Sequence, residues 1–158
     1  HDGQTVYDLL PKTGERLVPV GRLDKNSEGL LLLSNDGDLV HKLTHPRFEQ
    51  AKTYNATVSG NVNKEALDLL RSSMLIEGYR IRPAKVRVLR PSDKSGRWIL
   101  EFILKEGRKR QIRMMCEQAG LKIHRLTRVK INGLSLAGLQ TGKWRDLTPE
   151  ELKELKKA

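Results

Sequence analysis

Short strand-like and helix-like segments alternate along this chain, and their order constrains the fold more than any other sequence feature. Residues 84–89 and 98–104 have the apolar character of strands, and the polar stretch 92–96 between them has the length of a hairpin loop. Residues 53–59 alternate in the manner of a strand, whereas 109–118 place apolar residues at helical spacing. Hairpin connections favour antiparallel strands. We therefore predict an α+β fold, a mixed and mainly antiparallel sheet with flanking helices.

Capping and turn residues mark the other predicted elements. Asn63 is typical of the N-cap of a helix over 63–72. The run Thr148-Pro149-Glu150-Glu151 has the residues of a capping box, with proline at the first helical position. We further predict a capped turn over 6–10, strands over 17–23, 29–34 and 123–131, a turn over 35–37, and a helical turn over 38–44. The inward face of the strand over 123–131 stays open, because both of its alternating sets mix polar and apolar residues.

The charge of the chain indicates a polyanionic partner. The net charge is +11 and the pI about 10.0, and residues 105–130 alone hold nine basic and two acidic residues. Such a balance favours nucleic acid or an anionic membrane, and the lack of a long apolar run excludes an integral membrane protein. A basic run is also typical of a plain solvated surface, but apolar positions inside 105–130 favour an ordered element.

Length and composition predict one soluble domain without a metal. The 158 residues suit a single domain with a modest core, since 37% are hydrophobic and 31% charged. Cys116 has no second cysteine to pair with, so we expect a buried thiol in a reducing cytoplasm. His41 and His45 lack the intervening glutamate of a zinc-binding helix. The chain starts at His1 rather than Met, which predicts a fragment or processed product.

Asp24 and Tyr54 are candidates for chemistry, each with a simpler alternative. Asp24 follows the predicted strand over 17–23, and the nearby Arg22 favours the ionised carboxylate. A structural aspartate that caps a turn would show the same pattern. Tyr54 offers a ring for stacking and a phenol for hydrogen bonding, but a half-buried strand aromatic would occupy the same position.

The stretch over 106–115 is unusual because four cations precede or begin a predicted helix. Cations at a helix N-terminus oppose the helix dipole, and such a local cost favours a functional role. Two roles fit: binding of phosphate, or pairing of one arginine with a buried carboxylate. Helical spacing places Ile112, Met115 and Cys116 on the core face, close enough for Arg113 to reach inward.

Three stretches together resemble the motifs of the RsuA-like family of ribosomal RNA pseudouridine synthases. They are PVGRLDKNSEGLLLLSNDG over 19–37, KTY over 52–54 and EGRKRQIR over 106–113, and they occur in the family's order. The resemblance extends from about Thr5 to about Arg145. It implies that 1–158 form the catalytic domain, without the family's first strand and without its small N-terminal RNA-binding domain.

The resemblance also implies roles for single residues. Asp24 would be the catalytic carboxylate, Tyr54 the tyrosine near the target base, and Arg113 the partner that pairs with Asp24. Arg22 would help fill the space of the extruded base, and Ile112 would pack beside the pocket. The RNA-binding cations would be Arg22, Arg108, Lys109, Arg110, Lys122 and Lys130. No metal or cofactor is implied.

The implied reaction is the isomerisation of a specific uridine to pseudouridine in ribosomal RNA, most naturally that of the large subunit. The alternative is a catalytically silent RNA-binding or ribosome-assembly module on the same fold. The route is left open: Asp24 could attack C1′ or C6, or remove a sugar proton, and Tyr54 could stack or transfer a proton. Transfer RNA is left open as a further substrate. We expect a cytoplasmic monomer with no membrane partner.

Overall fold

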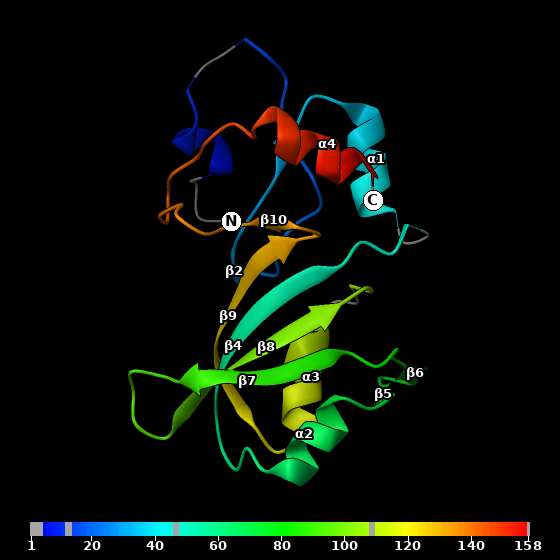
Figure 1. The fold of residues 1–158 in the computed structure, drawn as a ribbon, viewed down its shortest axis with the longest axis vertical. Helices are drawn as coiled ribbons and strands as arrows, with labels where there is room; N and C mark the ends of the chain where they lie inside the picture. Colours follow the sequence, from blue (N-terminus) through cyan, green and yellow to red (C-terminus); the bar gives the residue numbers. More distant parts are fainter. Residues whose placement is uncertain (1–4, 12–13, 46–47, 108–109, 158) are drawn as a thin grey trace.

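The computed structural model describes residues 5–11, 14–45, 48–107 and 110–157, and Figure 1 shows its course. In chain order the elements are η1 (Val6–Leu9), β1 (Val18–Pro19), β2 (Glu28–Gly29), β3 (Leu33–Ser34), α1 (Gly37–Thr44), β4 (Lys52–Ser59), α2 (Lys64–Leu70), β5 (Leu75–Ile76), β6 (Tyr79–Arg80), β7 (Lys85–Pro91), β8 (Arg97–Leu104), α3 (Gln111–Gln118), β9 (Lys122–Ile131), β10 (Leu134–Ser135) and α4 (Pro149–Lys157). The predicted α+β class is confirmed.

The main sheet has the order β10-β9-β4-β8-β7, and every pair along this path is antiparallel. Strand β2 joins the sheet by pairing in parallel with β9. The predicted hairpin of β7 and β8 is present, with its loop between them. Alternation along β4 buries Ala56 and Val58 completely on one face. That face packs against α2 and α3 through residues such as Leu70 and Met115.

A second, smaller core lies at one end of the sheet. It joins α1 and α4 through Leu39, Leu43 and Leu155, and it includes Leu134 of β10. In Figure 1, α1 and α4 lie together above the sheet, whereas α2 and α3 lie toward the opposite end. None of the helices in the described ranges is both long and apolar enough to span a bilayer.

The predicted caps of α2 and α4 are present, and α1 begins with a cap that we did not predict. The Asp36 carboxylate accepts the backbone N–H groups of the first turn of α1, and the Asn63 side chain accepts one from α2. Thr148 and Glu151 form the reciprocal hydrogen bonds of a capping box at the start of α4. The Cys116 thiol is fully buried as predicted, and burial raises its pKa to about 12.

The predictions over 17–23 and 29–34 were wrong in extent. Only Val18–Pro19 is strand in the first, and it pairs with Leu33–Ser34. The second divides because Glu28–Gly29 pairs with β9 instead. Gly29 has φ 118°, and a Cβ at this position would lie 2.2 Å from the backbone oxygen of Arg128. The close approach of two backbones therefore needs glycine here.

Candidate active site

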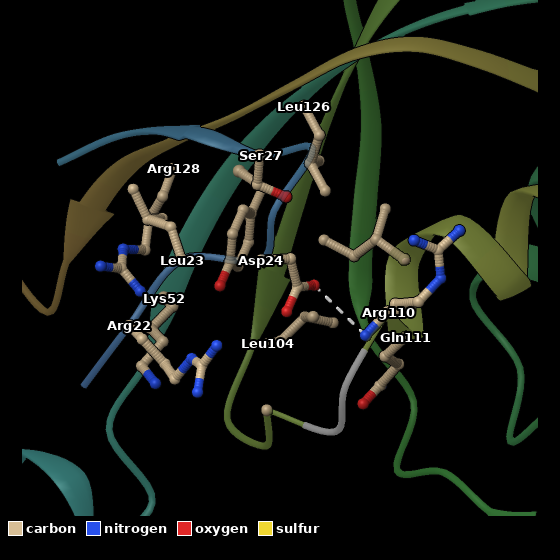
Figure 2. Close-up of a pocket in the computed structure, with 13 residues that line it drawn as sticks. Arg22, Leu23, Asp24, Ser27, Lys52, Leu104, Arg110, Gln111, Leu126 and Arg128 are labelled. Carbon is tan, nitrogen blue, oxygen red and sulfur yellow. Dashed lines mark hydrogen bonds between the residues drawn. The ribbon is translucent and has the colours of Figure 1, made fainter. Parts of the chain in front are cut away.

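A pocket of about 90 Å³ opens where β4 begins, β8 ends and α3 begins, and this volume has room for several water molecules. The segment 22–27 closes one side of it. Figure 2 shows Asp24 in the middle of the lining residues, with Arg22, Lys52 and Arg128 on one side and Arg110 and Gln111 on the other. The pocket therefore unites segments that lie far apart in the sequence.

Asp24 is half-buried and sits in a turn that is closed by a 2.9 Å hydrogen bond from the Ser27 N–H to the Asp24 carbonyl oxygen. Its Oδ2 accepts a hydrogen bond from the backbone N–H of Arg110 at 3.3 Å. Arg110 has φ 58°, a left-handed conformation at the N-cap of α3. The carboxylate thus faces the N-terminus of α3, where backbone donors and the helix dipole favour an anion.

Arg113 lies on the same helix but does not pair with Asp24. Its Nη2 donates to the carbonyl oxygen of Asn26 at 2.5 Å, and its Nε is buried with no hydrogen-bond partner among the described residues. Within the described ranges, no ion pair joins Arg113 to Asp24. The position of α3 accounts for this. The backbone N–H of Arg110, at the start of the helix, contacts the Asp24 carboxylate, whereas Arg113, about one turn later, contacts the loop that carries Asp24.

The apolar wall of the pocket comes from the sheet and from α3. Tyr54 is half-buried on β4 and packs against the main core while it lines the pocket. Ile112 is 3% exposed and lines the same pocket, as do the buried Leu104 and Leu126. Such a surface suits the flat face of a base, with Tyr54 as the ring available for stacking. Ile112 thus lies in the lining of this pocket.

The wall opposite α3 is basic, and sequence reasoning missed two of its residues. Arg128 is 2% exposed, and its Nε and Nη2 donate to the Leu30 carbonyl oxygen at 3.0 and 2.8 Å. Burial lowers the pKa of the Lys52 ammonium, and the charge of Arg128 adds to the effect. A signal existed for both residues: Lys52 begins the second motif, and Arg128 shares an alternating set with Leu126 in the predicted strand.

Four of the six predicted RNA-binding residues lie in the described part of the chain, and they form two groups. Arg22 and Arg110 are exposed and line the pocket. Lys122 and Lys130 are exposed near the two ends of β9, eight residues or about 26 Å apart, and neither lines the pocket. Arg108 and Lys109 lie outside the described residues.

The Ser27 hydroxyl was not predicted as a site group. It lines the pocket and is buried with no hydrogen-bond partner in the part of the chain that the structure describes.

The described side chains include no group of three or more His, Cys, Asp or Glu residues placed to hold a metal ion. Residues 3–118 match the family of RNA pseudouridylate synthases. The chain belongs to this family. The resemblance seen in the three motifs is thereby confirmed.

Curated relatives agree with this membership. The chain is 40% identical over 153 residues to ribosomal large subunit pseudouridine synthase B of Bacillus subtilis. This match covers 97% of the chain and 63% of the relative. The chain is 37% identical over 141 residues to the dual-specificity RNA pseudouridine synthase RluF of Escherichia coli K12, which covers 89% of this chain and 47% of the relative. The chain thus spans less than two thirds of the length of these relatives.

A solved structure described as a pseudouridylate synthase superposes with a TM-score of 0.81 at 29% identity. The match covers 96% of this chain and 65% of that one. The arrangement of sheet and helices around the pocket is therefore the arrangement of a pseudouridylate synthase.

Proposed function

We propose that this chain isomerises a specific uridine to pseudouridine in ribosomal RNA of the large subunit, with Asp24 as the catalytic carboxylate. One observation carries the proposal: a half-buried carboxylate, an aromatic side chain and a basic wall meet in one pocket of a pseudouridylate synthase fold. The relatives named for modification of RNA, and of the large ribosomal subunit in one case, support the choice of substrate.

The reaction needs an anion beside the sugar. Isomerisation breaks the N1–C1′ bond, turns the uracil, and joins C5 to C1′. Breaking the first bond builds positive charge at C1′, which a nearby carboxylate stabilises or bonds to. Asp24 provides this anion, and the N–H of Arg110 keeps one of its oxygens in place.

The base must leave the stack of the RNA before Asp24 can reach its sugar. Tyr54, Leu104 and Leu126 provide the apolar surface against which an extruded uracil packs. Arg22 and Arg110 are exposed cations at this pocket, and they contact the RNA backbone. Arg113 supports the site by holding the loop through Asn26. The protein acts as a cytoplasmic monomer.

The experiment compares Asp24→Asn with the parent on ribosomal RNA transcripts and on transfer RNA transcripts. We expect at least a ~10³-fold loss of pseudouridine formation, because the amide keeps the size of the carboxylate but not its charge or nucleophilicity. RNA affinity should stay within about threefold of the parent. Asp146→Asn, at an exposed position away from the pocket, is the matched control and should keep full activity.

Mapping pseudouridines in ribosomal RNA from cells with and without the gene identifies the target uridine. A parent enzyme that binds ribosomal RNA tightly but forms no pseudouridine would favour the silent RNA-binding module. Substantial activity of Asp24→Asn would overturn the role assigned to this carboxylate.

A further inference from the structure

Two cations lie together in the wall of the pocket opposite α3. Lys52 begins β4 two residues before Tyr54, and Arg128 is the cross-strand neighbour of Tyr54 on β9. Both line the pocket, and burial together with the charge of Arg128 lowers the pKa of Lys52. A Cβ added to Gly107 would lie 3.7 Å from the Lys52 Nζ, so the ammonium rests against the loop before α3.

This arrangement is unfavourable for the protein alone. The described residues show no ion pair for either cation, and the acceptor that Arg128 uses is the neutral carbonyl oxygen of Leu30. Burying like charges without an anion costs free energy, and proteins tolerate such a cost mainly at functional sites. Four cationic side chains line the described part of this pocket, against the single carboxylate of Asp24.

We propose that Lys52 and Arg128 form a subsite for one phosphodiester of the RNA, the one adjoining the target uridine. This inference rests on the proposed function, because it takes the ligand of the pocket to be RNA. The ammonium and the guanidinium each donate to a nonbridging oxygen, in the charge-assisted hydrogen bonds that such groups form with phosphate.

The position of the subsite relative to Asp24 supports a phosphodiester as its ligand. Figure 2 places Lys52 and Arg128 together on one side of Asp24. When the C1′ atom of the target nucleotide approaches Asp24, the nearest full negative charge of the RNA is a phosphate of the same nucleotide. A uracil carbonyl is a competing acceptor, but it is neutral and leaves the repulsion between the two cations uncompensated.

The test is a coupling experiment on binding. Synthetic hairpins of ribosomal RNA that carry the target uridine are used. In each hairpin one phosphodiester linkage is replaced by a neutral methylphosphonate, and all hairpins carry 2′-O-methyl sugars at the tested linkages to protect them from cleavage. Affinities are measured for the parent and for Lys52→Met. Lys25→Met is the matched control, because Lys25 is exposed on the same loop as Asp24 and does not line the pocket.

We expect one linkage whose neutralisation weakens binding to the parent about tenfold, the effect of one charge-assisted hydrogen bond. Lys52→Met should weaken binding to the unmodified hairpin by a similar factor, and the two changes together should cost no more than either alone. Lys52→Arg should restore most of the affinity, because it keeps the cation. In Lys25→Met the neutral linkage should still cost the full tenfold.

Independent, multiplicative losses for Lys52→Met and the neutral linkage would overturn the phosphate subsite, as would the lack of any sensitive linkage. Hairpins with 4-thiouridine or 2-thiouridine test a contact with the base. If the effect of Lys52→Met is coupled to one of these substitutions and not to a neutral linkage, Lys52 contacts a uracil carbonyl and the phosphate subsite is overturned. The readout is affinity and needs no turnover. Absence of pseudouridine formation by the parent therefore counts against the proposed function, whereas loss of coupling counts against the subsite.

Discussion

The two walls of the pocket hold their charges in different ways. On the α3 side, one oxygen of the Asp24 carboxylate accepts the backbone N–H of Arg110, and the Arg113 Nη2 donates to the Asn26 carbonyl oxygen. On the β4 and β9 side, Lys52 and Arg128 are like charges that line the same pocket, and Arg128 donates to the Leu30 carbonyl oxygen. The α3 side thus gives its anion a donor from the protein, although the Arg113 Nε has no described partner, whereas no described carboxylate pairs with Lys52 or Arg128 on the strand side. We therefore expect the strand side to gain more free energy from binding an anion. We infer that the α3 side positions Asp24 and that the strand side binds the RNA, as the proposed function requires.

The largest expected effect comes from Gly29→Ala, which disturbs the pairing of β2 with β9 next to Arg128. A Cβ at this position would lie 2.2 Å from the Arg128 carbonyl oxygen, and φ is 118°. The parallel pairing of β2 with β9 should separate, at a cost of more than ~3 kcal/mol in the free energy of unfolding. Chemical denaturation measures this. Gly78→Ala is the control and should cost much less, since its φ is also positive but its Cβ would meet no described atom within 4 Å.

The second prediction concerns the α3 wall. Arg113→Ala should lower the turnover number at least about 100-fold, because the loop that carries Asp24 is no longer held through Asn26. The free energy of unfolding should fall by only about 1–2 kcal/mol, since no ion pair with Asp24 is broken. Kinetics and thermal denaturation measure the two quantities. A loss of about 3–5 kcal/mol would indicate that Arg113 does pair with the Asp24 carboxylate in solution.

The third prediction concerns the strand wall, where stability and binding should change in opposite directions. Lys52→Met should raise the melting temperature by about 2–4 °C, because it removes a half-buried cation next to Arg128. It should also weaken RNA binding. The same change on the surface, Lys153→Met, should leave the melting temperature unchanged. A lowered melting temperature for Lys52→Met would show that the ammonium has a stabilising partner.

The difference in melting temperature between the parent and Lys52→Met should depend on pH, because the pKa of Lys52 is lowered in the folded protein. The folded state disfavours the charged form of Lys52. The resulting cost in folding free energy is therefore full at pH values below the lowered pKa. The penalty disappears as the pH rises from that pKa toward the unfolded value near 10.5. The melting temperature of the parent should therefore approach that of Lys52→Met as the pH rises through this window. A difference that widens would contradict the sign of the shift.

The smallest effect is expected away from both walls. Lys122 and Lys130 are exposed on β9 outside the pocket. The double variant Lys122→Ala/Lys130→Ala should weaken binding to many RNAs alike, and the slope of its salt dependence should flatten by about 0.7 to 0.9 for each phosphate that is no longer neutralised. The choice of uridine should not change. Binding across a salt series checks the slope, and changed selectivity with an unchanged slope would show that these lysines read sequence.

Much of the fold follows from local sequence. The caps at Asn63 and Thr148, the hairpin of β7 and β8, and the alternation along β4 were predicted, because each depends on residues within one or two turns or on strict alternation. The motifs also singled out Asp24, Tyr54 and Ile112, which the structure brings to one pocket. Their chemical roles stay predictions.

Which groups lie together in that pocket depends on contacts between distant parts of the chain. The contact of Asp24 with Arg110 joins residues 86 positions apart, and the pairing of Gly29 with Arg128 joins residues 99 apart. Neither contact leaves a periodic signal, because it arises when β2 docks on β9 and α3 packs on the sheet. The same docking buries Arg128 beside Lys52. Local patterns and motifs were therefore enough to predict the fold class and the family, whereas the docking of β2 and α3 on the sheet brings a backbone donor to Asp24 and places Lys52 and Arg128 in the same pocket.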